Sequence, residues 1–204
     1  MAGILFVSAC NPPKYVRYSS EFGDFVAQVP WGWSVYLDES GSVHYGYTFV
    51  GPFEPDFFRG VPTLNIRWYA YNKYHRLPHG RSDIFFSHED YIRETLREVY
   101  GPDRYLEQPV HRVAVSGWEG SHFVVVSPVE VPPDTRFGVS LERDGDKVVV
   151  LRQHAYVVLP MDSGFYVMIY PATRGGYGKY LDRFNHLVNT FRVIKDGPAG
   201  EPVR

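Results

Sequence analysis

Three histidines lie close together in the sequence and could ligate a metal ion: His75, His79 and His88. The i, i+4 spacing of His75 and His79 would place two imidazoles on one face of a helix, but Pro78 between them prevents a helix there. A loop could still bring the three rings onto one divalent cation, and the sequence suggests no other cofactor. The alternative interpretation is that they are solvated loop histidines.

The single cysteine, Cys10, ends the stretch Val7-Ser8-Ala9-Cys10, which resembles the lipid-attachment box of bacterial lipoproteins. In such a box the small residues fit the signal peptidase, and the thiolate accepts a diacylglycerol before the signal is removed. This predicts a lipid anchor at the bacterial cell envelope, facing the periplasm or the exterior. The apolar run is short and no basic residue precedes it. The alternative is therefore an apolar N-terminal strand with a buried cysteine in a cytoplasmic protein.

No stretch reaches the roughly 20 apolar residues that a membrane-spanning helix needs, so any membrane contact is expected to come through the lipid.

For hydrolytic chemistry, the nearest candidate nucleophile is Ser116 in the glycine-containing segment 116–122. This segment lacks the G-x-S-x-G spacing and the strand-to-helix turn that expose a nucleophilic serine, so it predicts a hairpin. The glycine-rich segment 174–178 lacks the Lys-Ser/Thr pair of a phosphate-binding P-loop. Because no catalytic constellation is recognisable, we expect a protein that is not an enzyme.

Aromatic residues make up 17% of the chain, with 16 tyrosines and 14 phenylalanines. A group of them crowds a region interrupted by Pro and Gly: Trp31, Trp33, Tyr45, Tyr47, Phe53, Phe57 and Phe58. Not all of these side chains fit into one core, so we expect some of them to form an exposed apolar face for a protein partner. The alternative is a second small cluster under a long loop.

The length of 204 residues suits one domain with a sizeable core. We expect a signal remnant, lipidation site and tether at 1–14, a single domain at 15–195 and a flexible tail at 196–204. The 21 basic and 23 acidic residues nearly balance and give a net charge of −2. This balance argues against nucleic acid as a partner.

Apolar residues alternate with polar ones in several segments, which predicts β-strands. Strands are expected at 25–29, 34–37, 43–50, 63–71, 110–115, 121–126, 147–159 and 165–170. In 63–71, the side chains on one face of the strand are expected to lie in the core, and those on the other face to be half-exposed. Apolar residues at helical spacing predict helices at about 87–100, with Ser87 as the cap, and at about 178–192. Segment 72–86 shows no periodicity and is expected to be a long loop that could bind a ligand.

Strands and helices in this order, without βαβ alternation, predict an α+β protein with a central, mainly antiparallel sheet. Two patches resemble the PsbP-like superfamily: Phe25-x-x-x-Val29-Pro30-x-Gly32-Trp33, and the Tyr/Val-rich hairpin that runs into Tyr180-x-x-x-Phe184 and ends in Val188-x-x-Phe191. This superfamily includes photosystem II extrinsic proteins, a Ran-binding nuclear transport factor and DcrB-type bacterial lipoproteins.

The resemblance implies an α/β/α sandwich that acts as a binding or assembly module with no shared catalytic apparatus. The main hypothesis from the sequence is a lipid-anchored, extracytoplasmic module that holds a protein partner through an aromatic face. The alternative hypothesis is a metal-binding protein or metal-dependent enzyme that uses the His75/His79/His88 loop.

Overall fold

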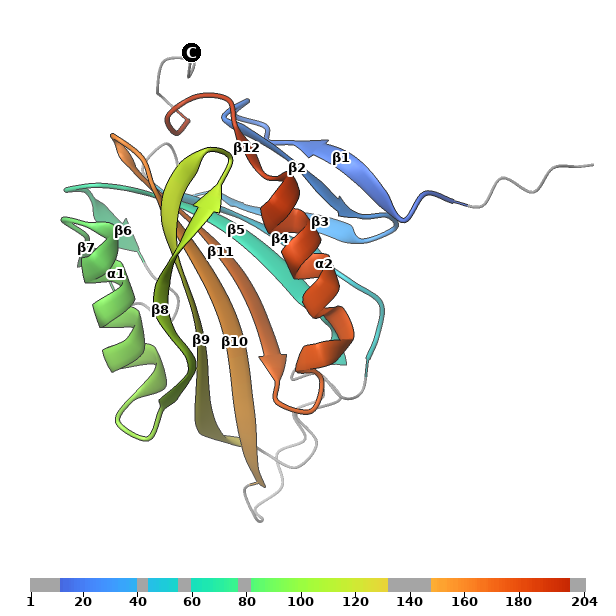
Figure 1. Cartoon of the computed structure of the whole chain (residues 1–204), viewed down its shortest axis with the longest axis vertical. Helices are drawn as coiled ribbons and strands as arrows, with labels where there is room; N and C mark the ends of the chain where they lie inside the picture. The colour runs from blue at the N-terminus through green and yellow to red at the C-terminus, as the bar shows by residue number, and fades with distance from the viewer. Residues whose placement is uncertain (1–11, 40–43, 55–59, 77–81, 132–147, 199–204) are drawn as a thin grey trace, which may run out of the picture.

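A seven-stranded antiparallel sheet forms the centre of the molecule (Figure 1). The computed structural model describes residues 12–39, 44–54, 60–76, 82–131 and 148–198. In spatial order the strands are β3 (Ser34–Glu39), β4 (His44–Val50), β5 (Thr63–Ala70), β11 (Gly164–Thr173), β10 (Val148–Pro160), β9 (Trp118–Val131) and β8 (Tyr105–Val115). All neighbouring pairs are antiparallel, which confirms the sheet predicted from the sequence.

One face of the sheet packs against a helix and a small three-stranded sheet. These elements are α2 (Tyr177–Thr190), β1 (Tyr15–Ser19), β2 (Phe25–Pro30) and β12 (Arg192–Val193). The alternating residues Phe25, Ala27 and Val29 of β2 are all buried in this first core, as predicted. From α2, the apolar stripe places Phe184 and Leu187 in the same core.

The opposite face carries a second core under α1 (His88–Glu94), which continues as one stretch of π-helix at Thr95–Val99. Ser87 caps α1, since its side-chain oxygen accepts a hydrogen bond from the Asp90 backbone N–H at 3.2 Å. The predicted helix and its cap are thus confirmed, and the two helices lie on opposite sides of the sheet (Figure 1). The molecule is an α+β sandwich of the predicted kind.

Two expectations need correction. Segment 72–86 contains a short hairpin, β6 (Tyr74–Arg76) and β7 (Ser82–Ile84), where a loop without strands was predicted. The second face of β5 was expected to be half-exposed, yet Tyr69 is 1% exposed. The physical reason is that α1 covers this face and encloses a core that one strand's alternation cannot reveal.

A two-residue turn joins β8 to β9 at Ser116 and Gly117. Both residues have positive φ, 56° and 85°, and Val115 pairs directly with Trp118. These values match a type I′ hairpin turn, whose twist suits antiparallel strands. The hairpin predicted for this segment is therefore confirmed, and the turn fixes the register of the long β8–β9 ladder.

Among the described residues, no helix has both the length and the apolar character that crossing a membrane requires.

Candidate partner-binding surface

Two of the residues predicted for an aromatic face, Tyr45 and Tyr47, lie in the first core with no exposed surface. The prediction is wrong for both, because β1 and β2 cover the inner face of β4 on which they lie. The Tyr45 hydroxyl donates to Oδ2 of buried Asp24, and the Tyr47 hydroxyl accepts a hydrogen bond from the Glu21 backbone N–H at 2.9 Å. Burial raises the pKa of Tyr45, so the phenol stays neutral. Both tyrosines stabilise the fold.

Other members of the predicted face lie at one end of the β3–β4 pair. Trp31 and Phe53 are 53% and 62% exposed. Trp33 is half-buried, with its ring centre 5.7 Å from that of Tyr180. Phe57 and Phe58 lie outside the described residues. From the predicted set, Trp31 and Phe53 are therefore the described side chains that are available to a partner.

Another exposed apolar group lies on the β6–β7 hairpin, where none was predicted. Tyr74 and Ile84 stand directly opposite each other in the two strands, and Phe86 follows two residues after Ile84. Their side chains are 67%, 43% and 70% exposed. We call Tyr74, Ile84 and Phe86 the hairpin surface. Exposed apolar groups of this kind are typical of interaction sites, although single exposed apolar residues are common.

Alternate residues of the same hairpin point inward and hold it against the second core. His75 is fully buried and Phe85 is 2% exposed, and their rings stack with centres 5.6 Å apart. His75 Nε2 lies 2.8 Å from the Ala70 carbonyl oxygen, and an edge-to-face contact joins the rings of His75 and Tyr69. The outer side chains are thus carried by an anchored hairpin. The alternation of Tyr74-His75 and of Ile84-Phe85-Phe86 was the available sequence signal.

The predicted metal site does not form around His75 in this structure. Its Nε2 is used by a backbone carbonyl, and burial lowers the pKa of the ring. His88 is half-buried, with Nδ1 3.2 Å from Glu89 Oε2, while His79 and Cys10 lie outside the described residues. Within the described ranges, no three His, Cys, Asp or Glu side chains lie close enough to hold a metal ion. His75 is better described as a core residue than as a ligand.

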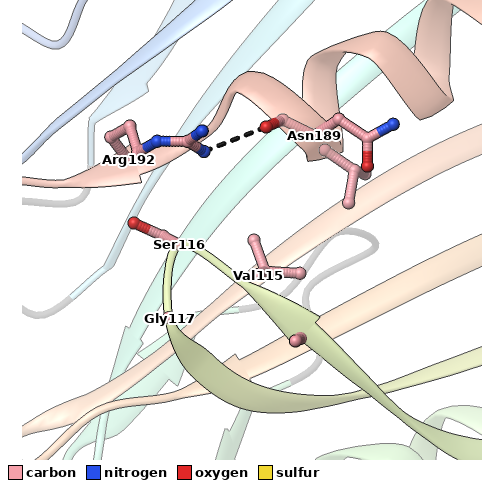
Figure 2. Close-up of a pocket in the computed structure, with 7 residues that line it drawn as sticks. Val115, Ser116, Gly117, Asn189 and Arg192 are labelled. Carbon is pink, nitrogen blue, oxygen red and sulfur yellow. Dashed lines mark hydrogen bonds between the residues drawn. The ribbon is translucent and has the colours of Figure 1, made fainter.

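An open groove lies between the β8–β9 turn and the C-terminal end of α2 (Figure 2). Its lining residues are Ala114, Val115, Ser116, Gly117, Val188, Asn189 and Arg192. Arg192 Nη1 donates to the Asn189 and Phe191 carbonyls at 2.9 and 2.7 Å, and Ser116 Oγ accepts from the Val193 N–H at 3.3 Å. These contacts tie the end of α2 to the turn. Ser116 has a structural role, and no histidine lines the groove to activate it.

The sequence matches no protein-family model and no curated protein. The solution structure of cyanobacterial PsbP (CyanoP) from Synechocystis sp. PCC 6803 superposes with a TM-score of 0.53, covering 95% of this chain and 98% of that chain at 13% identity. The chain has the PsbP fold.

Two further structural similarities are weaker. LpqN, described as involved in cell envelope biogenesis of Mycobacterium tuberculosis, matches with a TM-score of 0.44 and 11% identity, over 88% of this chain and 90% of LpqN. A single-residue mutant of the protein Mog1 matches with a TM-score of 0.48 and 12% identity, over 88% of this chain and 95% of Mog1. The match to CyanoP confirms the resemblance in fold that the sequence predicted, and at this identity it extends to fold alone.

Proposed function

We propose that the protein is a non-catalytic binding or assembly module that holds a protein partner through the hairpin surface. A lipid on Cys10 would tether this module to the bacterial cell envelope. The observation that carries the proposal is the exposure of Tyr74 and Phe86 beside Ile84 on an anchored hairpin.

The size of this surface is compatible with a binding site. Full burial of one large apolar side chain contributes about 1.5–3 kcal/mol. Since the three side chains of the hairpin surface are roughly half to two-thirds exposed, covering them would contribute about 3–5 kcal/mol before the entropic cost of association. Contacts of His75 and Phe85 with the second core already fix the hairpin, which lowers that cost. Tyrosine and phenylalanine are also typical of interface centres.

Two ionisable groups within the sandwich, buried Asp24 and half-buried His154, support a non-catalytic role. Asp24 is enclosed by the hydroxyls of Ser20, Tyr45 and Tyr166, and His154 Nδ1 lies 2.6 Å from the Tyr100 hydroxyl. These groups stabilise the two cores and do not line either of the open grooves near α2. The lipid tether is supported by the sequence around Cys10.

The partner surface can be tested by cross-linking in the native host. A photo-reactive phenylalanine analogue at Tyr74 or at Phe86 is expected to give the same cross-linked protein, and at Val149 it is expected to give none. Val149 is a suitable control because it is exposed to 61% but lies at the end of β10. Equal cross-linking from all three positions would contradict a specific surface.

Once the partner is known, a pair of matched double variants measures the contribution of each aromatic group. We expect Tyr74→Ser with Phe86→Ser to weaken binding at least about tenfold, which corresponds to about 1.4 kcal/mol. The control, Trp31→Ser with Phe53→Ser, removes comparably exposed aromatic rings and is expected to retain binding. The reverse pattern would assign the partner to the β3–β4 end and overturn the hairpin surface.

The tether is tested separately by the intact mass of the protein from membranes of its own host. An acylated chain beginning at Cys10, and release of the Cys10→Ser variant from the membrane, are the expected results. An unmodified chain in the soluble fraction would contradict the anchor. Binding of Cys10→Ser protein to anionic or neutral lipid vesicles through Tyr74 and Phe86 would contradict the choice of a protein partner.

A further inference from the structure

Two histidines that do not belong to the predicted metal loop stand opposite each other at the edge of the central sheet. His111 of β8 pairs directly with His122 of β9, and β8 is the last strand of the sheet. The ring centres are 4.9 Å apart and the ring planes meet at 72°. His122 also pairs with Val157, which belongs to the first core, so both imidazoles project from the α2 side of the sheet. His111 is exposed and His122 is half-buried.

The hydrogen bonding of His111 prepares one of its nitrogens for ligation. Its Nδ1 lies 2.9 Å from the Pro109 carbonyl oxygen, which can only accept. Nδ1 therefore donates, and in the neutral ring the free lone pair is on Nε2. An N–H donated to a backbone carbonyl is the usual second contact of a metal-ligating histidine, because it fixes the tautomer and orients the ring.

Irregular pairing of β8 creates this contact. The register shifts between Gln108 and His111, so that Pro109 and Val110 form a bulge directly before His111. A bulge bends an edge strand and redirects the side chain beside it. Here it also brings the Pro109 carbonyl to the His111 ring. Proline is suited to this position because an edge strand does not need its N–H for pairing.

The separation of the rings suits a shared metal ion. A Zn–N bond of about 2.1 Å, with about 1.1 Å more to the ring centre, places each centre about 3.2 Å from the ion. Two such ligands at a tetrahedral angle have ring centres about 5.2 Å apart. The observed separation of the ring centres, 4.9 Å, is close to this value. A small rotation of either side chain would remove the difference. His122 has no hydrogen-bond partner among the described residues that would compete for its nitrogens.

We propose that His111 and His122 form a two-histidine site for a divalent transition-metal ion that prefers imidazole, such as Zn²⁺, Ni²⁺ or Cu²⁺. Water or a ligand from another molecule completes the coordination. The site shares no residue with the hairpin surface or with the His75/His79/His88 set.

The test is a calorimetric titration of the full chain with Zn²⁺, repeated with Ni²⁺ and Cu²⁺. The chain carries Cys10→Ser, which removes a competing thiolate, and is first treated with EDTA. Mg²⁺, which prefers oxygen ligands, serves as the control ion and is expected not to bind. We expect His111→Ala and His122→Ala each to weaken Zn²⁺ binding at least about tenfold. The matched control is His186→Ala, because His186 Nε2 is hydrogen-bonded to Gln28 and its ring stacks on Tyr15.

The outcomes separate the possible sources of binding. Equal affinity in the parent, His111→Ala and His122→Ala, or no binding of Zn²⁺, Ni²⁺ or Cu²⁺, would overturn the site and leave a simple ring contact. Loss of Zn²⁺ binding in His79→Ala but not in His111→Ala would assign the metal to the His75/His79/His88 loop and would also overturn the His111/His122 site. If His122→Ala fails to fold, His111→Ala decides, because His111 is exposed. Zinc-dependent shifts of the His111 and His122 ring resonances, without shifts of His186, give an independent readout.

Discussion

Replacing Tyr45 by Phe removes one hydroxyl from the most deeply buried carboxylate in the described part of the protein. Asp24 has no exposed surface, and its Oδ2 accepts hydrogen bonds from the hydroxyls of Tyr45 and Tyr166, the latter at 2.7 Å. Its Oδ1 accepts from Ser20 Oγ. Among the described residues no Lys, Arg or His forms an ion pair with Asp24, so these hydroxyls replace its solvation.

A hydrogen bond to a charged group contributes about 1.5–3 kcal/mol, and the ring of Phe preserves the packing of Tyr45. We therefore expect Tyr45→Phe to lower the free energy of unfolding by about 1.5–3 kcal/mol. With an m-value of about 2 kcal/mol/M, the urea midpoint should fall by about 1 M. Tyr36→Phe is the matched control, since Tyr36 is 62% exposed and its change should stay within about 0.5 kcal/mol.

The reasoning is refuted if Tyr45→Phe and Tyr36→Phe have the same small effect on urea unfolding. A double-mutant cycle with Asp24→Asn sharpens the test, because the neutral amide should reduce the cost of Tyr45→Phe to about 1 kcal/mol. If Tyr45→Phe lowers the free energy of unfolding equally in the Asp24→Asn background, the hydroxyl of Tyr45 stabilises the protein through packing and not through its hydrogen bond to the carboxylate.

Two further predictions concern the second core and a close backbone approach. Burial and nearby Arg152 lower the pKa of His154 to about 3. The contribution of the neutral His154 ring to the free energy of unfolding is therefore complete above pH 6.5 and is lost as the pH falls towards 3. Thermal melts between pH 7 and about pH 4 should show a falling melting temperature, and the His154→Asn variant should show a smaller fall. An equal pH dependence in both proteins would contradict the role of His154. Gly164→Ala should destabilise by about 2 kcal/mol or more in urea, because a methyl group there would overlap the Tyr69 carbonyl and lie 2.6 Å from the Trp68 ring. Gly175→Ala, with no atom within 4 Å of the added methyl group, should be nearly neutral, and equal effects would refute the steric argument.

Sequence patterns predicted the elements whose signals are local. The alternation of Leu64, Ile66 and Trp68 identified the inner face of β5, and Ser87 identified the start of α1. The assignment of Tyr45 and Tyr47 to an exposed face failed because it assumed a single core of limited volume. A sheet covered on both faces has two cores, and the number of aromatic side chains cannot reveal which face is covered.

The hairpin surface was missed because its strands are short and the intervening sequence contains Pro and Gly. The pairing of His111 with His122 could have been predicted from the sequence. A two-residue turn at Ser116 and Gly117 pairs residues at equal distances before and after it, and both histidines are five residues from the turn. What the sequence did not reveal is the bulge that supplies the Pro109 carbonyl, because bulges depend on tertiary context.

The strand order of the central sheet also has a consequence for how the chain reaches its native state. Strands β3, β4 and β5 pair in succession, and so do β8, β9, β10 and β11. The ladder between β5 and β11 joins these two meanders, and its partners, such as Asn65 and Ile169, are on the order of 100 residues apart. Closing so large a loop is entropically expensive, so we expect it to limit the folding rate. During synthesis, β5 must wait for its partner until β11 emerges, and an unpaired strand edge of this kind is a site where aggregation can begin.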